Sequence, residues 1–150
     1  MSLRIEVATE NDIPALAELL SILFSQESEF TPNADAQKRG LSKIITNPAI
    51  GTVLVAKRCE STIGMVNLLY TVSTALGEPV ALLEDLIVRP EARCAGVGSK
   101  LLQEAICLAK ANGCKRITLL TDQTNLAAQR FYKRHGFESS LMMPLRLPIS

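Results

Sequence analysis

A glycine-rich hexapeptide, RCAGVG, spans residues 93–98 and stands directly before an apolar pattern that predicts a helix. The first backbone N–H groups of an α-helix lack carbonyl partners within the helix, and the helix dipole places partial positive charge there. Gly96 and Gly98 would let the chain turn tightly and let an anion approach without a Cβ in the way. Arg93 would add a full positive charge beside the turn. The pattern predicts a phosphate-binding turn, although it also suits an ordinary strand-to-helix turn with a solvated arginine.

Two well-known nucleotide motifs do not fit this turn. A Walker loop requires Gly-Lys-Ser/Thr, whereas here Lys100 follows Ser99. The dinucleotide fingerprint requires a third glycine at position 101, which is leucine.

A pair of carboxylates, Glu84 and Asp85, interrupts the apolar stretch LLEDLIV. Side chains alternate between the two faces of a strand, so the pattern predicts that these two carboxylates lie on opposite faces. A carboxylate in an apolar strand is costly unless it is paired or used. Glu84 is therefore either a functional group or a salt-bridged or edge-exposed side chain, and we expect Asp85 to be structural.

Other reactive side chains give weaker signals. His135, the only histidine, stands at a predicted helix C-terminus, where a partly cationic ring is favourable without any catalytic role. Cys94 stands at a helix N-terminus, which lowers a thiol pKa, but no base partner is identifiable. Glu27 and Glu29 lie in a polar loop and suit either an amine-binding loop or a solvated one. The four cysteines show no CxxC spacing, so we expect no metal site and a reducing, cytoplasmic compartment.

The elements that would position these residues follow from apolar periodicity and from turn residues. Strands are expected at 3–8, 52–58, 63–73, 80–88, 116–121 and 141–147, and helices at 12–24, 36–45, 100–113 and 125–134. This order predicts an α/β (α+β) fold with a mixed, mostly antiparallel central sheet flanked by helices. Pro144 weakens the closing strand.

Composition limits the classes of partner. The 150 residues fit a single domain, 1–150, and 47% hydrophobic with 21% charged residues is typical of a globular chain. A formal net charge of +1 argues against nucleic acid or an anionic membrane surface as partner. The N-terminus has no apolar signal-peptide region, and no apolar run approaches the length of a membrane span.

The hexapeptide resembles the pyrophosphate loop of the GNAT superfamily of N-acetyltransferases, Gln/Arg-x-x-Gly-x-Gly/Ala, and it matches every fixed position. The preceding LEDLIVRPEAR is similar to the family's fourth strand and its turn, and TNLAAQRFYKRHGF is similar to a second family signature. The resemblance covers nearly the whole chain in element order. Cys94 and Ala95 depart from it, because many relatives carry glycine and a basic residue there.

The resemblance implies acetyl-CoA as co-substrate and a primary amine as acceptor. The main chain of Leu86, Ile87 and Val88 would pair with the pantetheine arm like an added strand. Asn125 would contact acetyl-CoA from the last helix. The backbone N–H groups of the loop would hold the diphosphate; these belong to Arg93, Cys94, Ala95, Gly96, Val97, Gly98 and Ser99.

The resemblance also implies two catalytic residues. Tyr132 occupies the position where family members place a tyrosine beside the CoA sulfur, and a phenol is a suitable proton donor to a departing thiolate. The alternative is a packing role, since Ala128, Phe131 and Tyr132 share helical spacing. Glu84 resembles the acidic residue of LED-type strands in the polyamine-acetyltransferase branch, a candidate base or water-positioning group.

These features predict an N-acetyltransferase that moves the acetyl group to a small primary amine by direct attack in a ternary complex. Two alternatives stay open: a protein or peptide acceptor, and a CoA-binding regulatory domain without catalysis. Because family members are often dimers, a homodimer is expected, with residues 141–147 as a strand suited to the interface.

Overall fold

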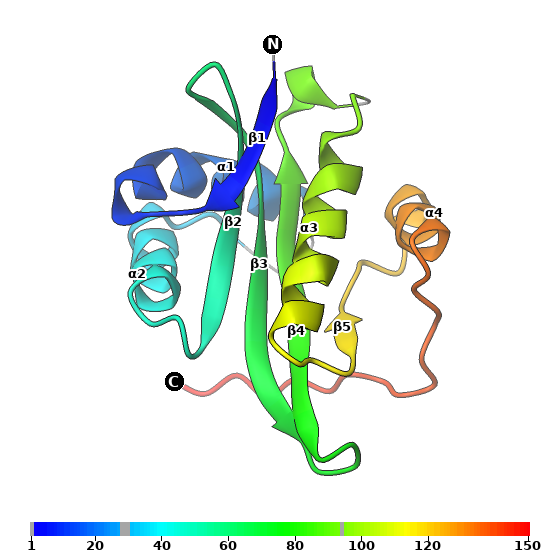
Figure 1. Ribbon diagram of the computed structural model, residues 1–150. Helices are drawn as coiled ribbons and strands as arrows, with labels where there is room; N and C mark the ends of the chain where they lie inside the picture. Colours follow the sequence, from blue (N-terminus) through cyan, green and yellow to red (C-terminus); the bar gives the residue numbers. More distant parts are fainter. Residues whose placement is uncertain (1, 28–30, 94) are drawn as a thin grey trace. The chain divides into compact units, whose positions relative to one another are not determined.

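The sheet of the first unit carries the candidate site. The computed structural model describes residues 2–27, 31–93 and 95–150, and the chain divides into two units, Met1–Leu120 and Thr121–Ser150. The first unit contains five strands in the order β1-β2-β3-β4-β5, of which the first four are antiparallel and β5 runs parallel to β4 (Figure 1). Their bounds are β1 (Leu3–Val7), β2 (Gly51–Arg58), β3 (Ser61–Ser73), β4 (Glu78–Val88) and β5 (Ile117–Leu119). The predicted mixed, mostly antiparallel sheet is confirmed.

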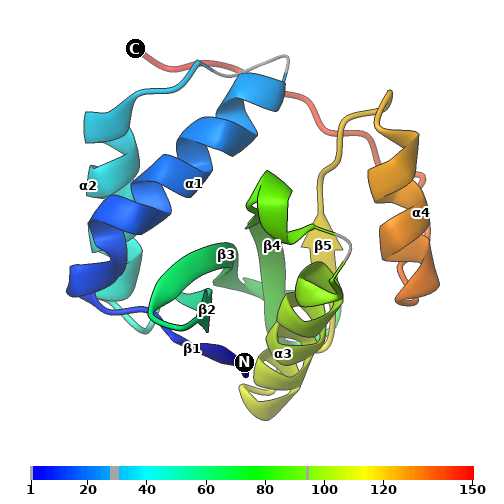
Figure 2. The same cartoon turned by 90° about the horizontal axis from the view of Figure 1, so that it is seen from above.

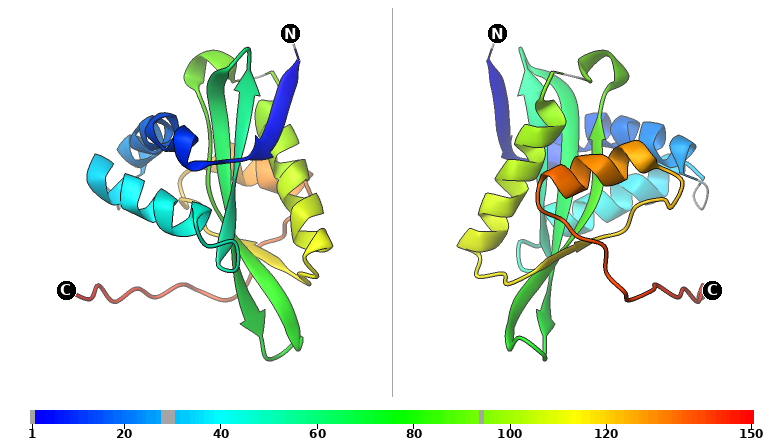
Figure 3. Two further views of the ribbon diagram at one scale, coloured as in Figure 1. Left: turned by 60° about the vertical axis from the view of Figure 1, so that its left-hand side comes forward. Right: turned by 90° about the vertical axis from the view of Figure 1, so that its right-hand side faces the viewer.

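Helices cover both faces of this sheet. In Figure 2, α1 (Ile13–Gln26) and α2 (Ala34–Ile45) lie on one face and α3 (Val97–Ala111) lies on the other, and Figure 3 shows the same two layers from the sides. Two 3-10 turns, η1 (Glu10–Asp12) and η2 (Pro90–Ala92), precede α1 and follow β4. The face under α1 and α2 holds the main apolar cluster, whose fully or nearly buried members include Leu16, Leu19, Leu41, Val53, Val55, Met65 and Ile87. Burial of such side chains is the principal stabilising contribution in a domain of this size.

Local hydrogen bonds explain where the first two helices begin. Thr9 and Asp12 form a capping box, with Thr9 N donating to Asp12 Oδ2 at 2.8 Å. Asn33 caps α2 by accepting from Ala36 N at 3.1 Å. Gln37 then joins the two helices, because its Nε2 donates to Ala17 O at 2.9 Å and to Ser21 Oγ at 3.0 Å. The pair α1–α2 is thus held as one layer by a buried polar side chain.

The second unit contains α4 (Leu126–Arg134), which Asn125 caps by accepting from Ala128 N at 3.0 Å. Gly136, at φ +98°, follows the helix end. The predicted closing strand at residues 141–147 is wrong, because this segment has no regular secondary structure. Pro144 and Pro148 lack the N–H that a sheet ladder requires, and the large apolar side chains of this tail are all exposed.

Candidate active site

A bulge in β4 reshapes the sheet beside the two acidic residues. The β3–β4 register runs Asn67↔Glu84 and then Met65↔Ile87, so Asp85 and Leu86 together oppose Val66. Asp85 has a φ of +58°, which non-glycine residues adopt rarely and Asp more readily than most. An inserted residue of this kind bends a strand and breaks its alternation.

The bulge overturns the expected positions of the two carboxylates. Glu84 is the direct cross-strand partner of Asn67, and directly opposed residues share a face of an antiparallel pair. Asp85 is hydrogen-bonded to the same asparagine, with Asn67 Nδ2 donating to Asp85 Oδ2 at 2.6 Å. The prediction that Glu84 and Asp85 lie on opposite faces is therefore wrong. Glu84 is exposed, whereas Asp85 is partly buried.

Asn67 is the residue that our sequence reasoning missed. It is only 3% exposed, and among the described residues its Oδ1 is a buried side-chain oxygen without a hydrogen-bond partner. A buried amide oxygen left unsatisfied is costly, and such atoms in native structures call for an explanation. The available signal was a single asparagine inside the apolar run IGMVNLLY.

The environment of Asp85 changes its acidity. The pKa of Asp85 is raised to about 7. Burial is the main cause, the negative charges of Glu84 and Glu27 contribute to the rise, and the hydrogen bond from Asn67 opposes it. A carboxylate with a pKa near neutrality is a better proton acceptor than one near the ordinary value of 3.8. Its pKa near 7 sets Asp85 apart from the purely structural carboxylate that the sequence predicted.

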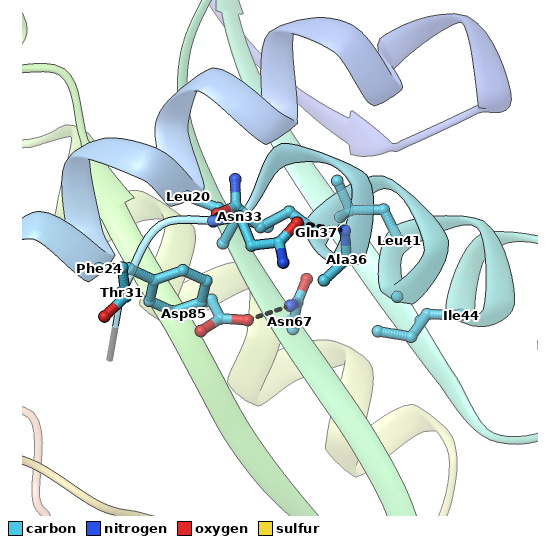
Figure 4. A pocket seen from close by; sticks show the side chains of 11 residues that line it. Leu20, Phe24, Thr31, Asn33, Ala36, Gln37, Leu41, Ile44, Asn67 and Asp85 are labelled. Carbon is cyan, nitrogen blue, oxygen red and sulfur yellow. Dashed lines mark hydrogen bonds between the residues drawn. The ribbon is translucent and has the colours of Figure 1, made fainter. Parts of the chain in front are cut away.

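A pocket of about 260 Å³ opens between the α1–α2 layer and this part of the sheet. Figure 4 shows Asn67 and Asp85 at its floor, with side chains of α1 and α2 around them. Leu20, Phe24, Leu41 and Ile44 give it apolar walls. Three further polar residues line it, Thr31, Asn33 and Gln37. Of these, Asn33 caps α2, and Gln37 accepts from Asn33 N at 2.8 Å.

The predicted diphosphate loop lies between β4 and α3. Gly96 has a φ of +80° and forms the N-cap of α3, as the predicted tight turn requires. A Cβ at Gly96 would meet no atom within 4 Å, so the space above the turn is open. At the first turn of α3, Lys100 N donates to Gly96 O at 3.1 Å. Arg93 is exposed and donates from Nε to Val88 O at 3.1 Å, while Cys94 lies outside the described residues.

One edge of β4 is open beside this loop. β4 pairs with β5 only through Ala81, Leu82 and Leu83. From Glu84 to Val88 it keeps β3 on one side, and the described part of the chain supplies no strand on the other side. The predicted main-chain partners of an extended ligand, Leu86, Ile87 and Val88, therefore stand on an edge that another extended segment can join.

The remaining predicted site residues belong to the second unit. Tyr132 is partly buried and its ring contacts Phe131 and Phe137 edge to face, at centroid distances of 5.3 and 5.8 Å. Asn125 uses its side-chain oxygen as the cap of α4. Both the packing and the catalytic interpretation of Tyr132 agree with these contacts.

Within residues 2–27, 31–93 and 95–150, no three His, Cys, Asp or Glu side chains gather as metal ligands. None of the described helices combines the length and apolar composition that a membrane span needs.

Comparisons with known proteins agree with this fold. Residues 13–137 match the acetyltransferase (GNAT) family. The chain is 33% identical over 138 residues to an uncharacterized N-acetyltransferase, YhfO, of Bacillus subtilis (strain 168), covering 91% of this chain and 90% of that protein. It is 25% identical over 146 residues to glucosamine 6-phosphate N-acetyltransferase of Trypanosoma brucei brucei, covering 93% and 91% of the two chains. The crystal structure of a transcriptional regulator from Bacillus halodurans C-125 is similar with a TM-score of 0.84 and 27% identity, covering 99% and 100%.

The chain therefore belongs to the GNAT acetyltransferase family, and the predicted fold is confirmed. It is an acyltransferase of the N-acetyltransferase type.

Proposed function

We propose that the protein transfers the acetyl group of acetyl-CoA to a small primary amine by direct attack in a ternary complex. The observation that carries this proposal is the pocket at the β4 bulge, which is lined by the Asp85 carboxylate of β4 and by the Asn67 amide of β3. Family membership supplies the reaction class, and the pocket supports a small acceptor.

The residues present fit acetyl-CoA. Leu86, Ile87 and Val88 would pair with its pantetheine arm along the open edge of β4. The loop 93–99 at the start of α3 would hold its diphosphate through backbone N–H groups, and the open space above Gly96 leaves room for it. Asn125 is retained as a further contact to acetyl-CoA. When bound, acetyl-CoA supplies the acetyl group as a thioester.

The proposed reaction needs two proton movements. An alkylammonium ion must lose one proton to a base before its nitrogen attacks the thioester carbonyl carbon. The C–N bond then forms, the C–S bond breaks, and the second proton leaves the nitrogen as the sulfur is protonated. Glu84, the base predicted from sequence, and Asp85, which lines the pocket, are the two candidates for the first proton.

We retain Tyr132 as the donor to the departing sulfur. Tyr132→Phe keeps the ring contacts with Phe131 and Phe137 and deletes only the hydroxyl. If the phenol donates in the transition state, kcat falls about 10- to 100-fold while acetyl-CoA affinity changes little. Steady-state kinetics at saturating acetyl-CoA measures this, and a kcat within about twofold of wild type would leave Tyr132 a packing residue.

The alternatives predict different substrates. A protein or peptide acceptor would leave small amines unacetylated, and a regulatory CoA-binding domain would bind CoA without turnover. A panel of alkylamines, polyamines, amino acids and peptides, assayed with acetyl-CoA by released thiol, separates these outcomes. We expect turnover with a small amine; binding of CoA without turnover of any amine would contradict the proposal.

Two further features belong to the proposal. The reducing, cytoplasmic compartment expected from the cysteine spacing stays part of the proposal. A homodimer is retained, with the apolar C-terminal tail as its contact surface.

A further inference from the structure

The pocket at the β4 bulge has one end that differs chemically from the rest. Its described lining consists of four large apolar side chains, a few small or already bonded groups, and the Asn67–Asp85 pair. Asp85 is the only charged residue among them. A ligand that fills this space meets negative charge and an amide oxygen at one end, and elsewhere it meets mostly hydrocarbon with the uncharged polar residues Thr31, Asn33 and Gln37.

Resting on the proposed acetyl transfer, we propose that Asn67 and Asp85 bind the amine end of the acceptor and that Asp85 takes its proton. We propose further that the pocket selects a small amine with an apolar body and rejects acceptors that carry a carboxylate or a phosphate.

The amine end is built from two complementary acceptors. Asn67 Nδ2 is committed to Asp85 Oδ2, which fixes the amide orientation and leaves Asn67 Oδ1 buried in the pocket lining without a partner. An ammonium group carries three N–H donors. One N–H would donate to Asn67 Oδ1 and another would donate to the Asp85 carboxylate. The first of these hydrogen bonds would remove the energetic penalty of burying Asn67 Oδ1 without a partner.

The charges around this end favour a cation. Glu84 on β4 and Glu27 after α1 both raise the pKa of Asp85, after burial as the main cause. The α2 residues of the lining are Ala36, Gln37, Gly40, Leu41 and Ile44, none of which titrates. A bound ammonium ion stabilises the ionised form of Asp85. The pKa of Asp85, about 7, is closer to the alkylammonium pKa near 10 than the pKa of an ordinary aspartate is, so proton transfer from the ammonium ion to Asp85 is less unfavourable.

The rest of the pocket limits the body of the acceptor. A volume of about 260 Å³ holds roughly nine water-sized volumes of about 30 Å³ each, which suits an acceptor of about ten non-hydrogen atoms. A carboxylate or phosphate placed against Leu20, Phe24 and Leu41 would lose its hydration without a cation among the described lining residues. Such acceptors are therefore disfavoured by desolvation and by the nearby negative charge.

Binding tests this inference apart from turnover. 2-Phenylethylamine has nine non-hydrogen atoms and an apolar body; 2-phenylethanol replaces its ammonium group, and phenylalanine adds a carboxylate. By calorimetry at pH 8, with and without CoA, we expect 2-phenylethylamine to bind at least tenfold more tightly than either analogue. Glucosamine 6-phosphate should bind at least tenfold more weakly as well. Equal or tighter binding of phenylalanine or glucosamine 6-phosphate would overturn the selectivity.

Variants test the two polar residues. Asp85→Asn should weaken 2-phenylethylamine binding at least tenfold at pH 8 and abolish the rise in affinity that the wild type shows between pH 5.5 and pH 8. Asn67→Leu should weaken binding at pH 8 with Asp85 still present. Asp35→Asn, which removes an exposed carboxylate from the first turn of α2, is the matched control and should change nothing. Unchanged affinity in folded Asp85→Asn and Asn67→Leu proteins, judged by circular dichroism, would overturn the amine site.

Kinetics then assigns the proton. Asp85→Asn should lower kcat at least 100-fold and remove the limb of the pH–rate profile near pH 7, whereas Glu84→Gln should lower kcat less than tenfold. The reverse order would overturn the role of Asp85 as base. Binding of 2-phenylethylamine without acetylation of any amine would leave the pocket assignment intact and contradict only the proposed function.

Discussion

At the scale of single residues, Asp85 combines an uncommon backbone conformation with an uncommon acidity. Its φ of +58° belongs to the left-handed region, where asparagine is accommodated as readily as aspartate. Asp85→Asn is therefore a conservative change for the backbone, and its oxygen still accepts from Asn67. The substitution isolates the effect of the charge.

The raised pKa of Asp85 makes a prediction about stability. Because burial raises this pKa from 3.8 to about 7, ionisation of Asp85 opposes folding. The destabilisation is absent below pH 3.8, grows as pH rises between 3.8 and about 7, and is complete above that. We expect Asp85→Asn to raise Tm at pH 8 and to change it much less at pH 4.5, as measured by calorimetric scans. An equal change in Tm at both pH values would show that ionisation of Asp85 does not oppose folding.

Gly96 permits a second prediction at this scale. Any side chain at its φ of +80° strains the turn by about 1 kcal/mol, so Gly96→Ala measures that strain alone. Gly96→Glu adds a negative charge in the open space where the diphosphate is proposed to lie. We expect CoA affinity to fall at least tenfold, or about 1.4 kcal/mol, beyond the effect of Gly96→Ala. Calorimetry with CoA gives both values, and equal affinities of the two variants would remove this loop from the site.

At the scale of elements, a charge cluster joins the edge strand to the start of α1. Lys57 Nζ on β2 lies 2.8 Å from Asp12 Oδ1 and 3.3 Å from Glu6 Oε1 on β1, and the side chains of Lys57 and Asp12 are only 16% and 9% exposed. The hydrogen bond to Asp12 raises the pKa of Lys57. Burial alone would raise the pKa of Asp12, but hydrogen bonds from Lys57 and Thr9 outweigh it and the net pKa is lowered.

Lys57→Met removes this cluster while keeping the length of the side chain. Removing one partner of a buried ion pair lowers the free energy of unfolding by about 3–5 kcal/mol. Because the Lys57–Asp12 pair is partly exposed, we expect a loss of about 1–3 kcal/mol. Because the pKa of Asp12 is lowered on folding, its ionisation stabilises the folded protein above pH 3.8, and this contribution is lost as pH falls through the pKa of Asp12 in the folded protein. Because the pKa of Lys57 is raised on folding, its contribution is present below pH 10.5 and is lost as pH rises beyond that value. Urea titrations at pH 7 and pH 3 should show a difference from wild type that shrinks at pH 3. Lys115→Met, at an exposed position, is the control.

Most elements could be predicted from the sequence, because their apolar periodicity and their caps act locally. Asn33, Asn125 and the Thr9–Asp12 box each bond within their own helix start, so the helix bounds agree within a few residues. The bulge at Asp85 could not be predicted, since it depends on how β4 aligns with β3 around Asn67. For this reason the sequence predicts only a structural role for Asp85, whose carboxylate lines the pocket.

At the scale of the whole molecule, the proposed machinery is divided between the two units. The acceptor pocket, the open edge of β4 and the glycine turn all belong to Met1–Leu120, whereas Tyr132 and Asn125 belong to Thr121–Ser150. The proposed amine binding at Asp85 and the proposed CoA binding at Gly96 thus concern residues of the first unit, and the Tyr132 variant tests the proposed role of a residue of the second unit.

The C-terminal tail concerns the association state. Six large apolar side chains there are each at least three quarters exposed: Leu141, Met142, Met143, Leu145, Leu147 and Ile149. Such a run of exposed apolar surface is typical of an interaction site, and a second copy of the chain is the proposed partner.

Removing residues 141–150 tests the proposed dimer. We expect the full chain to show twice its 16.3 kDa mass by light scattering after gel filtration, over a concentration series from the micromolar range upward. The truncated chain should show the monomer mass at the same concentrations. Leu145→Asp with Leu147→Asp, which keeps the length and places charge on two exposed apolar positions, should act in the same direction. A full chain that stays monomeric throughout, or a truncated chain that stays dimeric, would contradict this role of the tail.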